Sequence, residues 1–116
     1  MVDISVIIVS YNTAHLLEEA VSKVKNAAQG LSLECIFVDN ASKDDSVARI
    51  RALFPADTLI VNQTNVGFGR ANNQALAHAR GRYVLLLNTD TFVAPDTLVK
   101  TVAYMDANLR CGILGV

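Results

Sequence analysis

Short apolar runs alternate along this chain with longer segments of helical periodicity, and this alternation constrains the fold more than any other feature. The apolar runs have the composition of strands buried on both faces; they are residues 4–10, 34–39, 58–61 and 83–87. The helical segments are residues 13–28, a short stretch that stops before residue 55, residues 70–79 and residues 95–107. The run that starts at Cys111 is expected to begin a fifth strand. This order predicts an α/β fold with Rossmann-like alternating βα layers, in which a mostly parallel sheet carries helices on both faces.

Local signals mark the expected helix boundaries. Thr13 is placed to cap the first helix, and Ser42 with Asp45 three residues later is typical of a capping box for the second. Gly30 and Gly81 are expected to end the first and third helices, and residue 95, a proline, to lie in the first turn of the fourth.

Composition excludes several classes of protein. The 116 residues are enough for one domain, and a hydrophobic content of 52% with 18% charged residues excludes a disordered chain. A formal net charge of −1 gives no basic field for nucleic acid. No apolar run approaches the roughly 20 residues of a membrane span. We expect Cys35 and Cys111 to be buried thiols, and His15 and His78 to lie at the surface without metal partners.

Polar residues gather directly after each expected strand. Parallel strands bring their carboxyl ends to one edge of a sheet, where α/β proteins bind ligands. The sequence therefore predicts a ligand site there, built from four loops. Its residues are Ser10, Tyr11, Asn12 and Thr13; Asp39, Asn40, Ser42 and Asp44; Asn62, Gln63, Asn65, Gly67 and Gly69; and Asn88, Thr89 and Asp90.

Two familiar ligand-binding patterns do not fit. The segment Gly67–Asn72 has two of the glycines of a dinucleotide fingerprint, but Asn72 occupies the third glycine position and the segment follows the third strand rather than the first. A phosphate-switched receiver domain needs paired acids after the first strand, and the chain has none there.

Four motifs, in order, resemble those of family 2 glycosyltransferases, which have the GT-A fold and use nucleotide-sugar donors. They are VSYNT at residues 9–13, VDNASKDDS at 38–46, NVGFGRANN at 65–73 and LLNTDT at 86–91. The last motif is most similar to the rhamnosyltransferase-like branch. The resemblance covers the whole chain and implies that residues 1–116 are the N-terminal, nucleotide-sugar-binding part of a domain that continues beyond Val116.

The resemblance assigns the nucleotide base to Asp39. A carboxylate accepts a hydrogen bond from the N3–H of uracil or thymine, whereas adenine offers no such imide, so this residue favours uridine or thymidine donors. By the same resemblance, Tyr11 lies against the base, while Ser10 and Asn12 shape the pocket.

Further roles follow from the third and fourth motifs. Arg70, beside Asn65 and Gly67, is implied to contact the base edge or the diphosphate. Asp90 is implied to hold Mg²⁺ or Mn²⁺ together with the nucleotide, and Asn88 to bind ribose hydroxyls. The family's metal motif is Asp-x-Asp, and here its first position is Asn88, so the nucleotide phosphates are expected to supply much of the metal coordination.

These assignments imply an inverting transferase that moves a sugar from a UDP- or dTDP-sugar to a glycan, a lipid-linked or a small acceptor. Its catalytic base is expected beyond Val116, the fragment is expected to be inactive and prone to self-association, and the location is expected to be cytoplasmic, including the inner face of the membrane. Two alternatives stay open. A sugar-phosphate nucleotidyltransferase needs a glycine- and arginine-rich loop after the first strand, unlike residues 10–13, and a non-catalytic nucleotide-binding module is the other.

Overall fold

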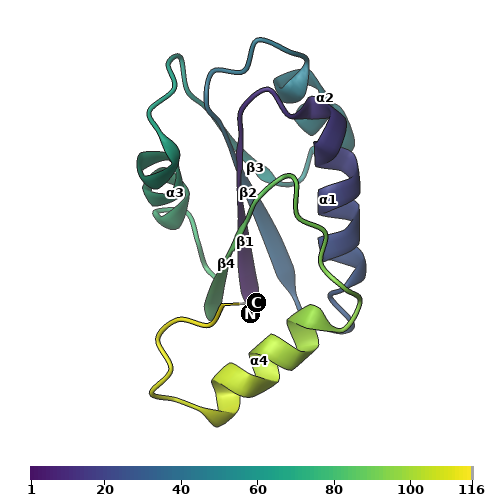
Figure 1. The fold of residues 1–116 in the computed structure, drawn as a ribbon, viewed down its shortest axis with the longest axis vertical. Helices are drawn as coiled ribbons and strands as arrows, with labels where there is room; N and C mark the ends of the chain where they lie inside the picture. Colours follow the sequence, from purple (N-terminus) through teal and green to yellow (C-terminus); the bar gives the residue numbers. More distant parts are fainter. Residues whose placement is uncertain (116) are drawn as a thin grey trace.

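The computed structural model describes residues 1–115 and shows a parallel sheet with helices on both faces (Figure 1). The strands are β1 (Ile4–Ser10), β2 (Leu33–Asp39), β3 (Thr58–Val61) and β4 (Tyr83–Leu87). The helices are α1 (Ala14–Asn26), α2 (Ser46–Leu53), α3 (Phe68–Leu76) and α4 (Thr97–Ala107). The strand order is β3-β2-β1-β4, so β1 lies inside the sheet and is paired on both sides. The predicted α/β architecture is confirmed.

Alternate side chains of β1 separate the core into two layers. Ile4, Val6 and Ile8 pack with residues of α1, α2 and α4 on one face. Ile7 belongs to the other layer, where it packs with Ala71 and Ala75 of α3. Helix α3 therefore covers its face alone, while three helices share the opposite face, as the ribbon shows (Figure 1).

The expected fifth strand does not form within residues 111–115, and Val116 lies outside the described residues. Among residues 1–115, β4 pairs only with β1, so its other edge is free, but residues 111–115 do not add to it. The backbone N–H of Cys111 instead donates to Asn108 O in a turn. Ile113 is 94% exposed, and Cys111 is half-buried rather than buried.

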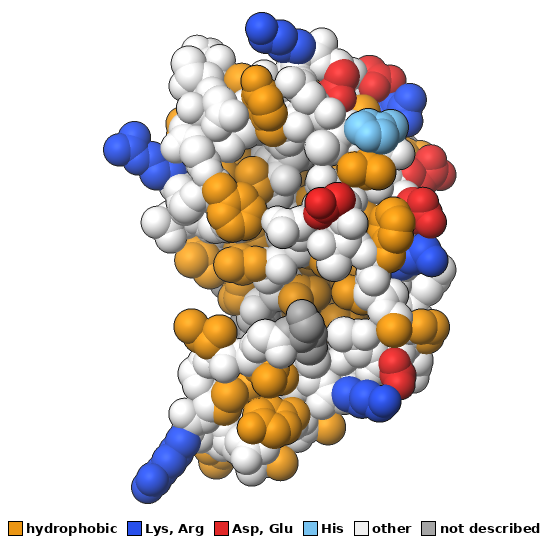
Figure 2. All heavy atoms as spheres, in the orientation of Figure 1, with side chains coloured by type: hydrophobic (Ala, Val, Ile, Leu, Met, Phe, Trp, Pro, Cys, Tyr) orange, Lys and Arg blue, Asp and Glu red, His pale blue; other side chains and the backbone are white. Residues whose placement is uncertain are grey.

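An apolar surface accompanies the free edge of β4. Val84 and Leu86 are exposed on the sheet face that α3 covers, because they register with Ser5 and Ile7 of β1. Phe68 and Leu76 of α3 are exposed as well. Figure 2 shows hydrophobic side chains on both sides of the indentation between the α3 side of the molecule and α4.

Helix α1 takes its cap from another loop. Thr13 occupies the N-cap position, as predicted, but its side chain makes no capping bond. The N–H of Ala14 donates instead to Asp44 Oδ2 at 3.1 Å. Burial acts to raise the pKa of Asp44, but hydrogen bonds from Ser46 and Ala14 outweigh it and hold the pKa below its usual value.

The predicted capping box of α2 is wrong. Asp45 is the N-cap residue, yet it makes no side-chain capping bond, and Ser42 is engaged elsewhere. The Ser42 hydroxyl oxygen accepts a hydrogen bond from Asn12 N at 2.9 Å, and the Ser42 N–H donates to Asp39 Oδ2. The β2–α2 loop is thus held by contacts across the edge of the sheet rather than by its own helix.

Several helix boundaries differ from the expected ones. The third helix starts earlier, at Phe68, and ends at Leu76, so Gly81 does not end it; the fourth starts at Thr97. Gly81 is required for another reason, because a Cβ there would lie 2.5 Å from the backbone nitrogen of Ser5. Gly30 does follow α1, with a φ of 90°.

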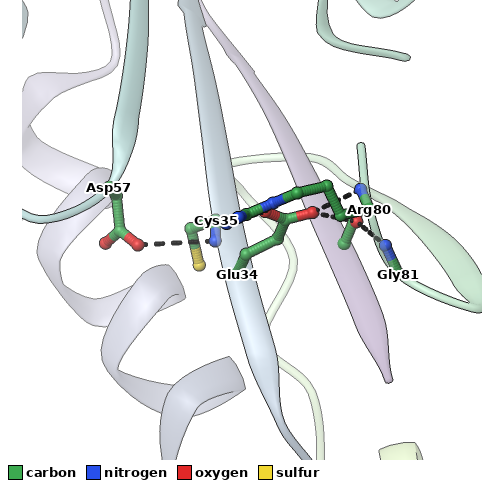
Figure 3. Close-up of polar contacts among 6 residues, drawn as sticks. Glu34, Cys35, Asp57, Arg80 and Gly81 are labelled. Carbon is green, nitrogen blue, oxygen red and sulfur yellow. Dashed lines mark hydrogen bonds and ion pairs between the residues drawn. The ribbon is translucent and has the colours of Figure 1, made fainter. Parts of the chain in front are cut away.

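A polar cluster ties the amino-terminal edge of the sheet together (Figure 3). Glu34 of β2 accepts hydrogen bonds from the Arg80 N–H at 2.6 Å and pairs with the Arg80 guanidinium at 3.0 Å. Gly81 N donates to Ser5 Oγ at 2.8 Å. Beside them, Cys35 is buried as predicted, and burial with the nearby Asp57 and Glu34 carboxylates raises the pKa of its thiol to about 12. This cluster lies at the opposite edge from the expected ligand site.

Candidate functional site

A hollow of about 660 Å³ lies at the carboxyl edge of the sheet, where the four polar loops meet. It is lined by residues of all four βα connections and of the first turn of α1 and α3. These residues are Val9, Tyr11, Thr13, His15, Leu16, Asn40, Asn65, Gly67, Phe68, Asn88, Thr89 and Asp90. The structure thus brings the predicted loops together into one open site.

The nine residues to which the family resemblance assigns a nucleotide or metal role divide into two groups. Five of them line the hollow: Tyr11, Asn65, Gly67, Asn88 and Asp90. The other four do not line it: Ser10, Asn12, Asp39 and Arg70. Ser10 and Asp39 are buried at the ends of their strands, while Asn12 and Arg70 are exposed.

Asn12 joins two of the loops. Its backbone has a φ of 54°, in the left-handed region that asparagine tolerates better than most residues. Its side-chain Oδ1 accepts a hydrogen bond from Lys43 N at 2.7 Å, and its N–H donates to Ser42 Oγ. Asn12 therefore fixes the turn that presents its neighbour Tyr11 to the hollow.

Asp39 has one carboxylate oxygen in use and one free. Its Oδ2 accepts a hydrogen bond from Ser42 N at 2.9 Å. Its Oδ1 is buried and, among residues 1–115, has no hydrogen-bond donor. The side chain is only 1% exposed, so this oxygen is an acceptor removed from water without compensation. Such a group gains free energy when a ligand donor reaches it.

The β3–α3 loop has a backbone conformation that needs glycine. Gly67 has a φ of 87° and a ψ of 167° and is the N-cap residue of α3. Its N–H donates to Asn65 Oδ1 at 2.9 Å, which holds the turn before the helix. The loop places Asn65 and Phe68 on the lining, while Arg70 extends from the first turn of α3 into solvent.

The donor set for a metal is small. Asn88 and Asp90 are exposed on the lining, and Thr89 between them is buried. Within residues 1–115, no group of three or more His, Cys, Asp or Glu side chains converges on a point. The Asp90 carboxylate and the amide oxygen of Asn88 are oxygen ligands of the kind that Mg²⁺ and Mn²⁺ accept, and phosphate oxygens can complete such a shell.

The two carboxylates that follow Asp90 are engaged away from the hollow. Asp96 Oδ2 pairs with Lys100 Nζ at 2.7 Å, which lowers the pKa of Asp96. Asp106 accepts a hydrogen bond from the Tyr83 hydroxyl and pairs with Arg82 at 3.0 Å, and both contacts lower its pKa.

Sequence reasoning did not place His15, Leu16 or Phe68 in the site, although all three line the hollow. Asn40, which the sequence placed in the site without a role of its own, is 3% exposed and also lines the hollow. Its position next to Asp39, directly after a buried strand, is the signal that placed it there. His15 is exposed, as predicted, and nothing in the sequence indicated that it would reach this rim.

The parallel sheet, with four loops meeting at its carboxyl edge, defines an α/β domain of the GT-A type. Residues 5–116 match the family described as Glycosyl transferase family 2. The chain therefore belongs to glycosyl transferase family 2.

Two curated relatives are similar over most of the chain. The succinoglycan biosynthesis protein ExoO of Rhizobium meliloti (strain 1021) is 32% identical over 106 residues, which are 90% of this chain and 30% of that protein. An uncharacterized glycosyltransferase of Haemophilus influenzae is 32% identical over 108 residues, 90% of this chain and 43% of that protein. The chain thus spans less than half the length of either relative.

Solved structures share the fold. The mannosyltransferase PcManGT from Pyrobaculum calidifontis, in complex with GDP-Man and Mn²⁺, is 32% identical with a TM-score of 0.79, covering 88% of this chain and 32% of that one. TarS of S. aureus in complex with UDP-GlcNAc is 26% identical with a TM-score of 0.70, covering 92% and 32%. Within residues 1–115, no helix has the length and apolar character that crossing a membrane requires.

Proposed function

We propose that this chain binds the nucleotide part of a UDP- or dTDP-sugar for a glycosyltransferase that inverts the anomeric centre. The observation that carries the proposal is the buried, unpartnered Oδ1 of Asp39, the residue directly before Asn40, which lines a hollow built from all four polar loops. Uracil and thymine offer an imide N–H to this oxygen, and adenine does not. A base that donates this bond replaces an uncompensated acceptor with a charge-assisted hydrogen bond.

Guanine is a second candidate base. Its N1–H and N2–H₂ are neighbouring donors, so a carboxylate can accept from guanine as well as from uracil. PcManGT, the solved structure with GDP-Man, supports testing it, because that protein is 32% identical to this chain. The Asp39 carboxylate therefore favours uracil, thymine and guanine over adenine. Affinities measured with a panel of nucleotides are needed to choose among these three bases.

We assign the remaining nucleotide contacts from where each residue lies relative to the hollow. Tyr11 is half-exposed on the lining and offers a ring face for a base, while Ser10 and Asn12 support that turn from behind. Asn65 and Gly67 also lie on the lining, and Arg70, in the first turn of α3, would meet the base edge or the diphosphate.

Asp90 would hold a divalent cation, Mg²⁺ or Mn²⁺, and Asn88 would contact the ribose hydroxyls. When bound, such an ion neutralises the charge that develops on the leaving diphosphate. Asp90 is the acidic side chain on the lining among residues 1–115, so it is the natural ligand for an ion shared with phosphate oxygens.

The transfer itself needs a carboxylate base that removes the proton of the acceptor hydroxyl, which then displaces the diphosphate. Asp96 and Asp106 are paired with cations outside the hollow and are poorly placed for this task. We assign the base, and the site of the glycan, lipid-linked or small acceptor, to a part of the full-length protein after residue 116. The LLNTDT segment supports the rhamnosyltransferase-like branch.

Calorimetry of this chain with UDP, dTDP, GDP and ADP, each with and without Mn²⁺, tests the proposal. We expect UDP or dTDP to bind measurably and ADP to bind at least about tenfold more weakly, the loss of one charge-assisted bond. Equal affinity for ADP and UDP would remove the assignment of Asp39. Binding of nucleotide by the full-length protein without sugar turnover would favour a non-catalytic module, and release of pyrophosphate from a nucleoside triphosphate would favour a nucleotidyltransferase.

A further inference from the structure

Asn40 connects three of the four loops that build the hollow. It follows β2 directly, and its backbone N–H donates to Ser10 O at 2.8 Å, which extends the pairing of β1 and β2 by one bond. Its side chain turns the other way along the edge, toward the β3–α3 loop. The residue is 3% exposed, so its amide makes its bonds in a site shielded from water.

The Asn40 amide holds the backbone of the β3–α3 loop at two points. Its Nδ2 donates to Gly67 O at 3.2 Å, and its Oδ1 accepts from Val66 N at 3.2 Å. One side chain thus pairs with a donor and an acceptor of two adjacent residues, as a neighbouring strand would. These bonds select the unusual backbone conformation of Gly67, at a φ of 87°.

The side-chain amides of Asn62 and Gln74 support the amide of Asn40. Asn40 Oδ1 also accepts from Asn62 Nδ2 at 3.1 Å. Asn62 and Gln74 exchange two hydrogen bonds, at 2.8 and 2.9 Å, which link the loop to helix α3. Every member of the network is a neutral amide, so its geometry does not depend on the protonation of any of them.

We propose that Asn40 is a positioning residue for nucleotide binding: it orders residues 62–67 before the ligand arrives. This inference rests on the proposed function. An ordered loop spares the ligand the entropy of fixing it, so affinity is higher than for a mobile loop with the same contacts. Asn65 and Gly67, on the lining, are the residues whose placement depends on it.

The test compares UDP binding in the presence of Mn²⁺ for the wild-type chain and three variants. Asn40→Ala removes all three side-chain bonds, and Asn40→Asp keeps the volume and the acceptor but places a carboxylate oxygen against Gly67 O. Asn73→Ala is the matched control, since Asn73 is exposed on α3, next to Gln74 in the sequence, and has no part in the network. We expect Asn40→Ala and Asn40→Asp to weaken binding by about tenfold or more, and Asn73→Ala to leave it within about twofold.

Amide hydrogen exchange separates positioning from general damage. In Asn40→Ala, exchange should accelerate at Val66 and stay slow at Ile8, in the middle of the sheet, and saturating UDP should slow Val66 again. If Asn40→Ala does not fold, Asn40→Asp carries the test. Wild-type affinity in a folded Asn40→Ala or Asn40→Asp variant would overturn the inference. Failure of the wild-type chain to bind any nucleotide would instead overturn the proposed function.

Discussion

The hydroxyl of Ser5 donates a hydrogen bond to Glu34 Oε2 at 2.5 Å, joining the neighbouring strands β1 and β2 near their amino ends. The same carboxylate also accepts a hydrogen bond from the Arg80 backbone N–H and pairs with the Arg80 guanidinium. The Glu34 side chain is 13% exposed. Burial acts to raise the pKa of Glu34, but the bonds from Ser5 and Arg80 outweigh it and the pKa is lowered. The ionised form is therefore the one that the fold stabilises.

This contact makes stability depend on pH on the acid side. A carboxyl whose folded pKa lies below its unfolded value, about 4.3 for glutamate, stabilises the fold above that value and loses this contribution as pH falls through the folded pKa. We expect Glu34→Gln to lower the free energy of unfolding by about 1–2 kcal/mol at pH 7. Urea unfolding from pH 7 to pH 3 should show this difference shrinking toward acid. Glu19→Gln, at an exposed position on α1, is the control, and a difference that stays constant with pH would contradict the assignment.

Asp39→Asn should weaken nucleotide binding without lowering the free energy of unfolding. The amide can still accept from Ser42 N, but it presents an N–H₂ or a neutral oxygen where the buried Oδ1 now lies. We expect UDP binding to weaken by about 1.5–3 kcal/mol, measured by calorimetry. The free energy of unfolding should not fall, because the substitution removes a buried charge with an unpartnered oxygen. Unchanged UDP affinity would show that the base does not bind this residue.

Divalent metal should strengthen the binding of UDP and leave the binding of uridine unchanged, because the phosphates supply most of the ligands. Asp90→Asn should remove most of that gain, about tenfold in affinity. Asp45→Asn, an exposed aspartate on the α2 side, is the control and should retain it. Titration of Mn²⁺ alone should show weak binding, since residues 1–115 bring no three acidic, cysteine or histidine ligands together. Tight binding of Mn²⁺ without nucleotide would place the metal elsewhere.

Sugar transfer by the 116-residue chain should stay at background. Asp96 and Asp106 are held by Lys100 and Arg82, so neither is free to take a proton from an acceptor. The measurement is release of nucleoside diphosphate from a panel of donors with Mn²⁺ and candidate acceptors. Turnover that Asp96→Asn or Asp106→Asn abolishes would show that the base lies on α4 after all.

The free edge of β4 should make the chain self-associate. Leu86 is 52% exposed beside unpaired backbone groups, which is a template for pairing with a second copy. Sedimentation at increasing concentration should show dimers or larger species, and Leu86→Lys should reduce them. Leu53→Lys, at an exposed position on α2, should not. A monomer at all concentrations would mean that the edge is protected in solution.

The periodic features of the fold were predictable, because each strand and helix is encoded by its own residues. The strands at 4–10, 58–61 and 83–87 match the structure in full. Features that depend on residues distant in the sequence were not predictable. The cap of α1 comes from Asp44, 30 positions away, and no local pattern around Thr13 contains it. Likewise, a strand after Cys111 was expected from apolar composition alone, which does not reveal whether the segment lies against the free edge of β4.

The site was predictable as a set of loops but not as a set of contacts. Parallel topology places the polar segments at one edge, and all four loops contribute to the hollow. Which side chain contacts which loop could not be predicted from the sequence. Asn12 and Asn40 have the same chemistry, yet each holds a different neighbouring loop because of where its backbone directs the amide.

The order of strands has a kinetic consequence. β1 is the earliest strand in the sequence and is paired on both sides in the sheet, with β2 on one side and β4 on the other. During synthesis, one flank of this apolar strand remains open until residues up to Leu87 have left the ribosome. Pairing across about 80 residues is a non-local step that slows folding. Over that interval the nascent chain depends on α1 and β2 to shield β1 from other chains.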